Sequence, residues 1–309
     1  MGMTRTFKIV LFFFILSLII SCDSELLEVV PDNESYSTTS ISKIKIENYV
    51  NRLFIDIIGR EPNDIEQSQE ADFLNENDLS EDARLDLITR LMKDTTFSEN
   101  EGSYQEAFSN NLYLLAKIRC IEGVSDQAIR SFELNVLRNT AYQDSLNQNW
   151  EDYFIKLNRI RRYELLLRSA SDLQKGKIKF HEVFAYMIDN GIYDSFNMNA
   201  FNFIRASFDQ LLFRLPTDQE FNQALNMVAN QIPDELLGQL GNSKTDYINI
   251  MIGSVAMKEG MIRWAYHVFL QRPGTPAEIA TLLETYKLDN NINNVIAKIV
   301  ITDEYANFY

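Results

Sequence analysis

Three copies of one short phrase constrain the fold of this chain more than any other feature of the sequence. In each copy an arginine stands six residues after an aromatic residue and six residues before a glutamate. The arginines of the first, second and third copies are Arg60, Arg214 and Arg272. Because the same spacing recurs at distant positions, we expect three copies of one structural unit.

Each copy has the pattern of one helix that ends and another that begins. Before the arginine, apolar residues recur at helical spacing, and this stripe predicts one buried helix face. In the second copy the stripe consists of Ile204, Phe208, Leu211 and Leu212. After the turn, a capping residue precedes the glutamate by three positions, which predicts a capping box. The capping residues are Asn63, Thr217 and Thr275.

The three arginines allow two interpretations. They could bind anions, or each could complement the dipole of the helix that it ends and pair with the glutamate of its own copy. We favour the structural interpretation, because the glutamate spacing repeats together with the arginine. A second apolar segment closes each unit, at 87–97, more weakly at 250–255, and at 295–305. Each unit is therefore predicted to be a helical hairpin.

This pattern resembles two bacterial families of unknown function. Tyr49–Lys117 resembles the helical domain that accompanies cytochrome-like modules in planctomycete proteins, and Phe201–Tyr309 resembles a short helical repeat of secreted and surface proteins. The resemblance implies a helical fold and supplies no catalytic residues. The sequence departs from the pattern where Gly59 of the first copy becomes Phe213 and Gln271 in the others.

The first 21 residues predict a lipoprotein signal peptide. A short basic start with Arg5 and Lys8 precedes an apolar run over 9–20, which is too short to span a bilayer stably. The run ends at Ser21 and Cys22, which resemble a bacterial lipobox. The resemblance implies cleavage before Cys22 and a lipid such as palmitate on its sulfur, and therefore a membrane anchor.

Residues 22–43 lack periodicity and are rich in loop-forming residues, so we expect a flexible tether. Its acidic start at Asp23 and Glu25 resembles the surface-export signal of Bacteroidota-type lipoproteins. Inner-membrane retention is the alternative. We expect an outer-membrane lipoprotein exposed at the cell surface.

Beyond the tether we expect an all-α fold of helical hairpin repeats, packed into one or two helical bundles. Residues 44–197 would form an N-terminal helical domain and residues 198–309 a C-terminal helical repeat domain. No alternating strand of useful length is evident, and Asn190-Gly191 has the pattern of a helix end. The net charge of −15 argues against nucleic acid as a partner. Cys120 is expected to be a buried apolar residue without a disulfide partner.

One basic tract lies in the middle of the chain, over residues 156–179. It could bind acidic groups, or it could be a solvated helix face that acidic neighbours balance. The aromatics that follow could stack on a sugar or belong to the core. The candidate ligand-binding residues are Arg159, Arg162, Tyr186 and Tyr193.

Signatures of catalysis and of metal binding are absent from the sequence. His181 and His267 are the two histidines, and no phosphate loop, nucleophile elbow or Cys-x-x-Cys motif occurs. We therefore expect no enzyme, no cofactor and no metal. The expected function is that of a non-catalytic binding or assembly component of an outer-membrane complex with an envelope protein as partner. The alternatives are a glycan-binding surface lipoprotein and a helical enzyme with an unrecognised carboxylate site.

Overall fold

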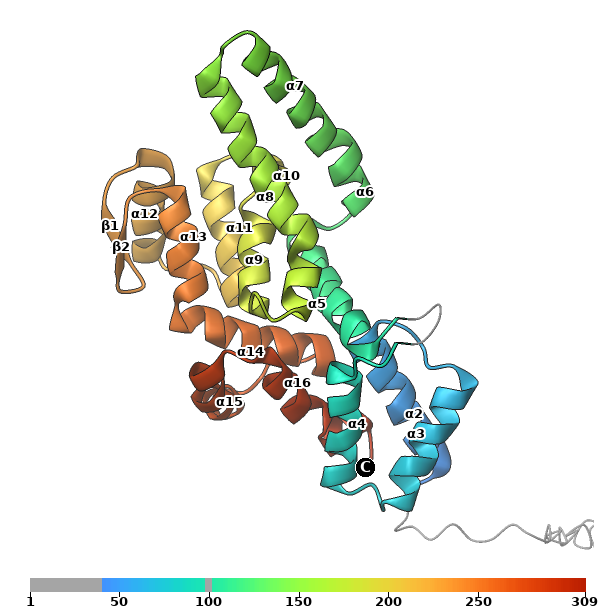
Figure 1. Ribbon diagram of the computed structural model, residues 1–309. Helices are drawn as coiled ribbons and strands as arrows, with labels where there is room; N and C mark the ends of the chain where they lie inside the picture. The colour runs from blue at the N-terminus through green and yellow to red at the C-terminus, as the bar shows by residue number, and fades with distance from the viewer. Residues whose placement is uncertain (1–40, 98–101) are drawn as a thin grey trace, which may run out of the picture. The chain divides into compact units, whose positions relative to one another are not determined.

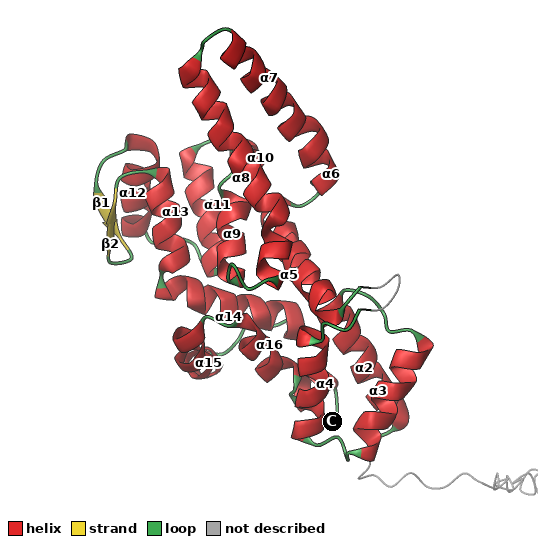
Figure 2. Ribbon diagram, viewed as in Figure 1, coloured by secondary structure: helices red, strands yellow, loops and turns green. Residues whose placement is uncertain are grey.

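The computed structural model describes residues 41–97 and 102–309, and these residues are mainly helical (Figure 2). The all-α fold is confirmed. The expected signal peptide, Cys22 and all but the end of the expected tether lie outside the described residues. Ile41–Tyr309 form one compact unit, and the boundary expected after residue 197 lies inside it.

The first copy of the repeated phrase forms a helical hairpin near the start of this unit (Figure 1). Its elements are α2 (Lys43–Leu53), the π-helical turn η1 (Phe54–Ile58), α3 (Asp64–Glu76) and α4 (Glu81–Lys93). Gly59 ends η1 in the left-handed conformation, with φ +82°. Phe213 and Gln271 adopt the same conformation in the other copies, each with φ +54°. The departure noted in the sequence therefore leaves the backbone turn unchanged, at the cost of a strained non-glycine residue.

The middle of the chain is a run of helices between the first and second copies. Its elements are α5 (Tyr104–Ile121), α6 (Asp126–Ala128), η2 (Ile129–Leu134), α7 (Asn135–Leu146), α8 (Trp150–Gln174), α9 (Phe180–Ile188) and α10 (Gly191–Asn197). Helix α5 packs on α8 and α9. Cys120 of α5 is buried and free, as expected, and burial raises the pKa of its thiol to about 12.

Helix α9 ends at Ile188, directly before Asn190-Gly191, as expected, and α10 begins at Gly191, which was not expected. The buried Asn190 side chain accepts hydrogen bonds from the backbone N–H groups of Ile192 and Tyr193. Its Nδ2 also donates to the carbonyl oxygens of Tyr186 and Met187, in the last turn of α9. One asparagine thus closes one helix and opens the next, while Asp189 is the C-terminal cap residue of α9.

The second and third copies follow one another in the C-terminal part. Their elements are α11 (Ala200–Leu212), α12 (Asp218–Leu225), η3 (Asn226–Asn230), β1 (Asp234–Leu236), β2 (Gln239–Gly241), α13 (Lys244–Gly253), α14 (Val255–Leu270), α15 (Pro276–Asp289), α16 (Ile292–Val300) and α17 (Asp303–Ala306). The antiparallel pair β1–β2 was not expected from the sequence. Its strands have three residues each, and the turn at Leu237 and Gly238 has positive φ at both residues, as tight hairpins require.

The hairpins share one apolar core. Helix α14 packs on α11 of the second copy and on α15 and α16 of its own. The first copy packs against the third, because α4 contacts α16 and α2 contacts α17. The Tyr49 hydroxyl donates to the carbonyl oxygen of Val300 at 3.1 Å, and the Tyr305 hydroxyl donates to Asp56 Oδ2 at 2.8 Å. The two ends of the compact unit are therefore packed side chain to side chain.

Candidate functional site

The three arginines of the repeated phrase form the same ion pair. In each copy both Nη atoms donate to the two carboxylate oxygens of the glutamate six residues later. The two donor–acceptor distances are 2.7 and 2.7 Å for Arg60–Glu66, 2.8 and 2.6 Å for Arg214–Glu220, and 3.0 and 2.7 Å for Arg272–Glu278. The pairing that the sequence predicted is confirmed, and its bidentate geometry is the strong form of a charge-assisted hydrogen bond.

The glutamate of each copy also holds the start of the following helix. One oxygen accepts from the backbone N–H of the cap residue, at 2.8 Å for Asn63, 2.9 Å for Thr217 and 2.7 Å for Thr275. The hydrogen bonds from Arg214 and Arg272 lower the pKa values of Glu220 and Glu278 to about 2. These carboxylates are therefore ionised structural groups at neutral pH.

The aromatic residue of each copy lies beneath its arginine. The guanidinium carbon stands 5.6 Å from the Phe54 ring centre in the first copy, 5.3 Å from Phe208 in the second and 5.2 Å from Tyr266 in the third. Aromatic face, guanidinium and carboxylate thus form one stack at each turn. The repeated spacing encodes this stack and not three anion-binding sites.

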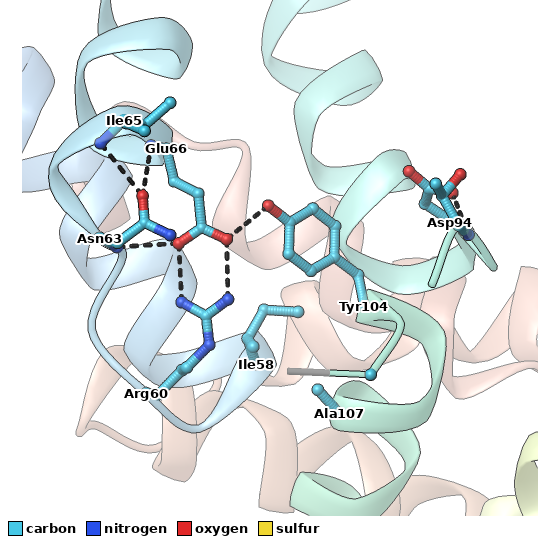
Figure 3. A pocket seen from close by; sticks show the side chains of 10 residues that line it. Ile58, Arg60, Asn63, Ile65, Glu66, Asp94, Tyr104 and Ala107 are labelled. Carbon is cyan, nitrogen blue, oxygen red and sulfur yellow. Dashed lines mark hydrogen bonds and ion pairs between the residues drawn. The ribbon is translucent and has the colours of Figure 1, made fainter. Parts of the chain in front are cut away.

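A cavity of ≈ 310 Å³ adjoins the stack of the first copy (Figure 3). Figure 3 shows the Tyr104 ring reaching toward Glu66, and the Tyr104 hydroxyl donates to Glu66 Oε1 at 2.7 Å. Burial raises the pKa of Glu66, but the hydrogen bonds from Arg60, Asn63 and Tyr104 outweigh it, and the net shift is downward. The wall of the cavity is therefore a closed hydrogen-bonded network. Thr96 and Gly102 are among its lining residues, and we assign no ligand to it.

The structure brings two of the four candidate ligand-binding residues together. Arg162 and the half-buried Tyr186 line one cavity of ≈ 120 Å³ with Asp189, Thr245 and Asn249. Arg162 Nη1 lies 2.8 Å from Asp189 Oδ1. Burial raises the pKa of the Asp189 carboxyl, and the charge of Arg162 opposes this shift. The cavity is smaller than the 300–1,000 Å³ that is usual for ligand pockets.

The other two candidates lie elsewhere. Tyr193 is fully buried, its hydroxyl donates to Gln210 Oε1 at 2.6 Å, and its ring packs edge-on against Phe203. It has no free ring face for a sugar. Arg159 is exposed and hydrogen-bonds the hydroxyl of Tyr163, one turn further along α8.

Much of the basic tract is balanced by acidic neighbours. Lys156 pairs with Asp144 of α7, and Arg162 pairs with Asp189 at the end of α9. Arg168 lies 2.9 Å from Asp172, in the same helix. These pairs support the interpretation of a solvated, locally neutralised helix face.

We define the arm as residues 135–162, which comprise α7 and the first half of α8. The arm carries exposed apolar side chains that were not expected from the sequence. Helix α7 makes its main contacts with α8 and η2 (Figure 1). Close to the turn between the two helices, large apolar side chains remain in solvent, Phe154 at 61% and Trp150 at 52% exposure. We define the arm surface as Tyr142, Leu146, Trp150, Phe154 and Ile155. Trp150 and Phe154 both pack edge-on against Tyr153, with ring centres 5.8 and 5.4 Å apart.

The sequence pattern could not reveal this surface. Trp150, Phe154 and Leu157 follow one another at the spacing that is typical of a buried helix face. They are nevertheless exposed, whereas Tyr163 and Leu166, further along α8, are buried.

The described residues offer neither a metal site nor a membrane span. No cluster of three or more His, Cys, Asp or Glu residues in 41–97 and 102–309 is arranged to hold a metal ion. None of the helices in those ranges has the length and apolar character needed to cross a membrane.

The fold and these surfaces define an all-α protein built on helical hairpins. Comparison with known proteins adds no relative, because no family model, no curated protein and no solved structure matches this chain. The resemblance to two helical families therefore stays a prediction.

Proposed function

We propose that the protein is a non-catalytic binding or assembly component of the bacterial cell envelope, held at the outer membrane by a lipid on Cys22. The observation that carries the proposal is the arm surface. Large apolar side chains that remain exposed near one another are unfavourable in water and commonly mark protein interfaces, and Trp150 and Phe154 both pack on Tyr153. Aromatic residues, which dominate this surface, are also enriched in the energetic centres of interfaces.

The electrostatics of the repeats support a non-catalytic role. Glu220 and Glu278, whose pKa values are lowered to about 2, each bind an arginine and the start of a helix. They stabilise turns and are not free to transfer protons. The charged groups of the repeats therefore stabilise the hairpins. The arm, in contrast, offers a surface for a partner.

The test is co-purification from detergent-solubilised membranes with the natively expressed chain. We expect an envelope protein complex with the wild-type chain, and its loss with Phe154→Ser. Leu288→Ser is the matched control, since Leu288 is 86% exposed on α15, outside the arm. Cys22→Ala is expected to release the chain from the membrane. If Phe154→Ser retains the complex, or if the wild-type chain comes down alone, the proposal fails.

A glycan-binding lipoprotein is the second candidate, and one observation favours it. Arg162 and Tyr186 share a cavity with the polar side chains of Thr245 and Asn249. Its small volume would admit only part of a sugar. Binding on a glycan array that Tyr186→Ala abolishes would support this candidate, and an array without binding would remove it.

A further inference from the structure

We propose that one face of α8 in the arm binds the same face of a second copy of this chain, with the two helices antiparallel. This inference rests on the proposed function, because it names the partner of the arm. We define the pairing face as Glu151, Phe154, Ile155, Asn158 and Arg161. All five side chains are exposed, Phe154 at 61% and Ile155 at 53%.

The five residues lie on one side of the helix. Their positions follow the i, i+3, i+4, i+7, i+10 pattern, which keeps side chains on a common stripe at about 100° per residue. The neighbouring Lys156 points elsewhere, because its ammonium pairs with Asp144 of α7. The pairing face is therefore turned away from α7 and open to a second helix.

The two charges on this face have no ion-pair partner in the described part of the chain, although the charge of Arg161 reaches Tyr186 of α9, where it opposes the upward shift of the tyrosine pKa. Neither Glu151 nor Arg161 makes an ion pair or a side-chain hydrogen bond there, whereas Arg138, Lys156 and Arg162 of the same arm are all paired with carboxylates. The face thus has an acidic end, an apolar centre and a basic end, in that order along α8.

This order is self-complementary in the antiparallel direction. A two-fold axis perpendicular to α8 near residue 156 places Glu151 opposite Arg161 of the second copy, and Arg161 opposite the second Glu151. Phe154 then lies opposite Asn158 of the second copy, about one helical turn from the second Phe154, and Ile155 lies about two residues along the axis from the second Ile155, so the two apolar centres overlap. Every contact occurs twice, as in any isologous dimer. Antiparallel helices pack at about 8–10 Å, which brings these side chains into contact.

The net charge of the chain explains why two copies would associate through this face and not through another. The chain carries a net charge of −15, so two copies repel one another over most of their surfaces. A stripe with its own basic end offers a place where acidic residues of the second copy find an opposite charge. Complementary charges of this kind fix the register and direction of an interface.

The test measures the mass of the full chain, purified in detergent, by light scattering over a range of protein concentrations. We expect a concentration-dependent dimer. Glu151→Arg places two arginines opposite each other, and Arg161→Glu places two glutamates opposite each other, so each should weaken dimerisation about tenfold or more. The double variant Glu151→Arg/Arg161→Glu restores opposite charges and should return to within about threefold of wild type.

A matched pair of charge reversals serves as the control. Asp152 and Arg159 lie on the same helix but off the pairing face, so Asp152→Arg and Arg159→Glu should not rescue one another. The inference is overturned if the wild-type chain stays monomeric up to about 100 µM, a weak affinity for any specific interface. Lack of rescue in the double variant would also overturn it.

The outcomes separate the two proposals. If the chain is monomeric while Phe154→Ser still abolishes the envelope complex, the arm serves a different protein and only the self-pairing is wrong. If the dimer and the charge rescue are found but no envelope complex is recovered, the self-pairing stands and the proposed assembly function fails.

Discussion

The second and third copies of the repeated phrase build the same turn but hold it with different strength. Arg214 and Arg272 each lie on an aromatic ring and clamp their own glutamate. Arg272 also binds a second carboxylate, with its Nε at 2.5 Å and Nη2 at 2.7 Å from the oxygens of Glu304. Among the described residues, Arg214 has no ion pair other than that with Glu220. The phrase therefore fixes the turn, and a carboxylate from a later helix, α17 in the third copy, decides how firmly the arginine is held.

Glu304 lies at the start of α17, and the corresponding helix of the second copy is α14. The two helices begin in the same way. Thr302 caps α17 by accepting from the N–H of Tyr305, and Ser254 caps α14 by accepting from the N–H of Met257. This alignment places Ala256 where the third copy has Glu304. The start of α14 lies near Arg214, because Glu259, one turn further, adds to the effect of Glu220 in raising the pKa of Arg214. Four experiments test this difference between the second and third copies.

The largest effect is expected where the second copy packs on the third. A Cβ added at Gly260 of α14 would stand 2.0 Å from the carbonyl oxygen of Leu211. The added Cβ would force the backbone of α11 or α14 to move, which is costly in a packed core. Gly260→Ala should therefore reduce the free energy of unfolding, measured by urea titration, by about 3 kcal/mol or more.

Gly253→Ala is the control for this prediction. A Cβ at Gly253, the last residue of α13, meets nothing within 4 Å. We expect a change below about 0.5 kcal/mol. Equal effects of the two substitutions would show that the α11–α14 contact does not need the glycine.

The second largest effect is expected when the two arginines are replaced, and the loss of stability should differ between them. Arg272→Met leaves two carboxylates without their cation and should cost about 2 kcal/mol, whereas Arg214→Met leaves one and should cost about 1 kcal/mol. Chemical denaturation at low salt measures both values. Arg205→Met, which removes a cation stacked on Phe201 at 5.5 Å, is the control and should cost less than either. If Arg214 proves the costlier, the second carboxylate is not what strengthens the third copy.

Acid should weaken both copies in the same pH window. Glu220 and Glu278 have pKa values of about 2 in the folded chain, below the usual value of about 4.3 in an unfolded chain. The folded state thus binds fewer protons, and its stability is full above about pH 4.5 and falls as the pH drops toward 2. Thermal melting across this range should show the loss. Glu220→Gln and Glu278→Gln should each flatten the profile, and an unchanged slope in both would contradict the assignment.

The smallest expected effect is an increase in the free energy of unfolding. Ala256→Glu supplies the second copy with the carboxylate that Glu304 gives to the third, and should add about 0.5 kcal/mol of stability. A glutamate in the first turn also favours the helix by itself. The double-mutant cycle with Arg214→Met isolates the ion pair, and additive effects in that cycle would mean that the new carboxylate does not reach Arg214.

How much the sequence revealed depends on the range of the interactions. The hairpin turns were predictable, because the stack of Phe54, Arg60 and Glu66 involves residues that are close together in the sequence, at a spacing of six. The helix end before Asn190 was predictable, whereas the start of α10 directly after it was not, since a short polar side chain can close one helix and open another. The exposure of Trp150 and Phe154 depends on where the body of the fold ends, and helical spacing carries no information about that.

The contact between the first and last hairpins has a consequence for how the chain is made. Arg52 donates to the carbonyl oxygens of Tyr305 and Phe269, both at 2.6 Å, and its guanidinium lies 4.1 Å from the Tyr305 ring centre. The first hairpin therefore finds packing partners that are translated 217 and 253 residues after Arg52. Contacts of such high contact order form slowly, because a long loop must close before they contribute. The first hairpin must wait, incomplete, until Tyr305 has been translated, and a truncation before Tyr305 removes this contact.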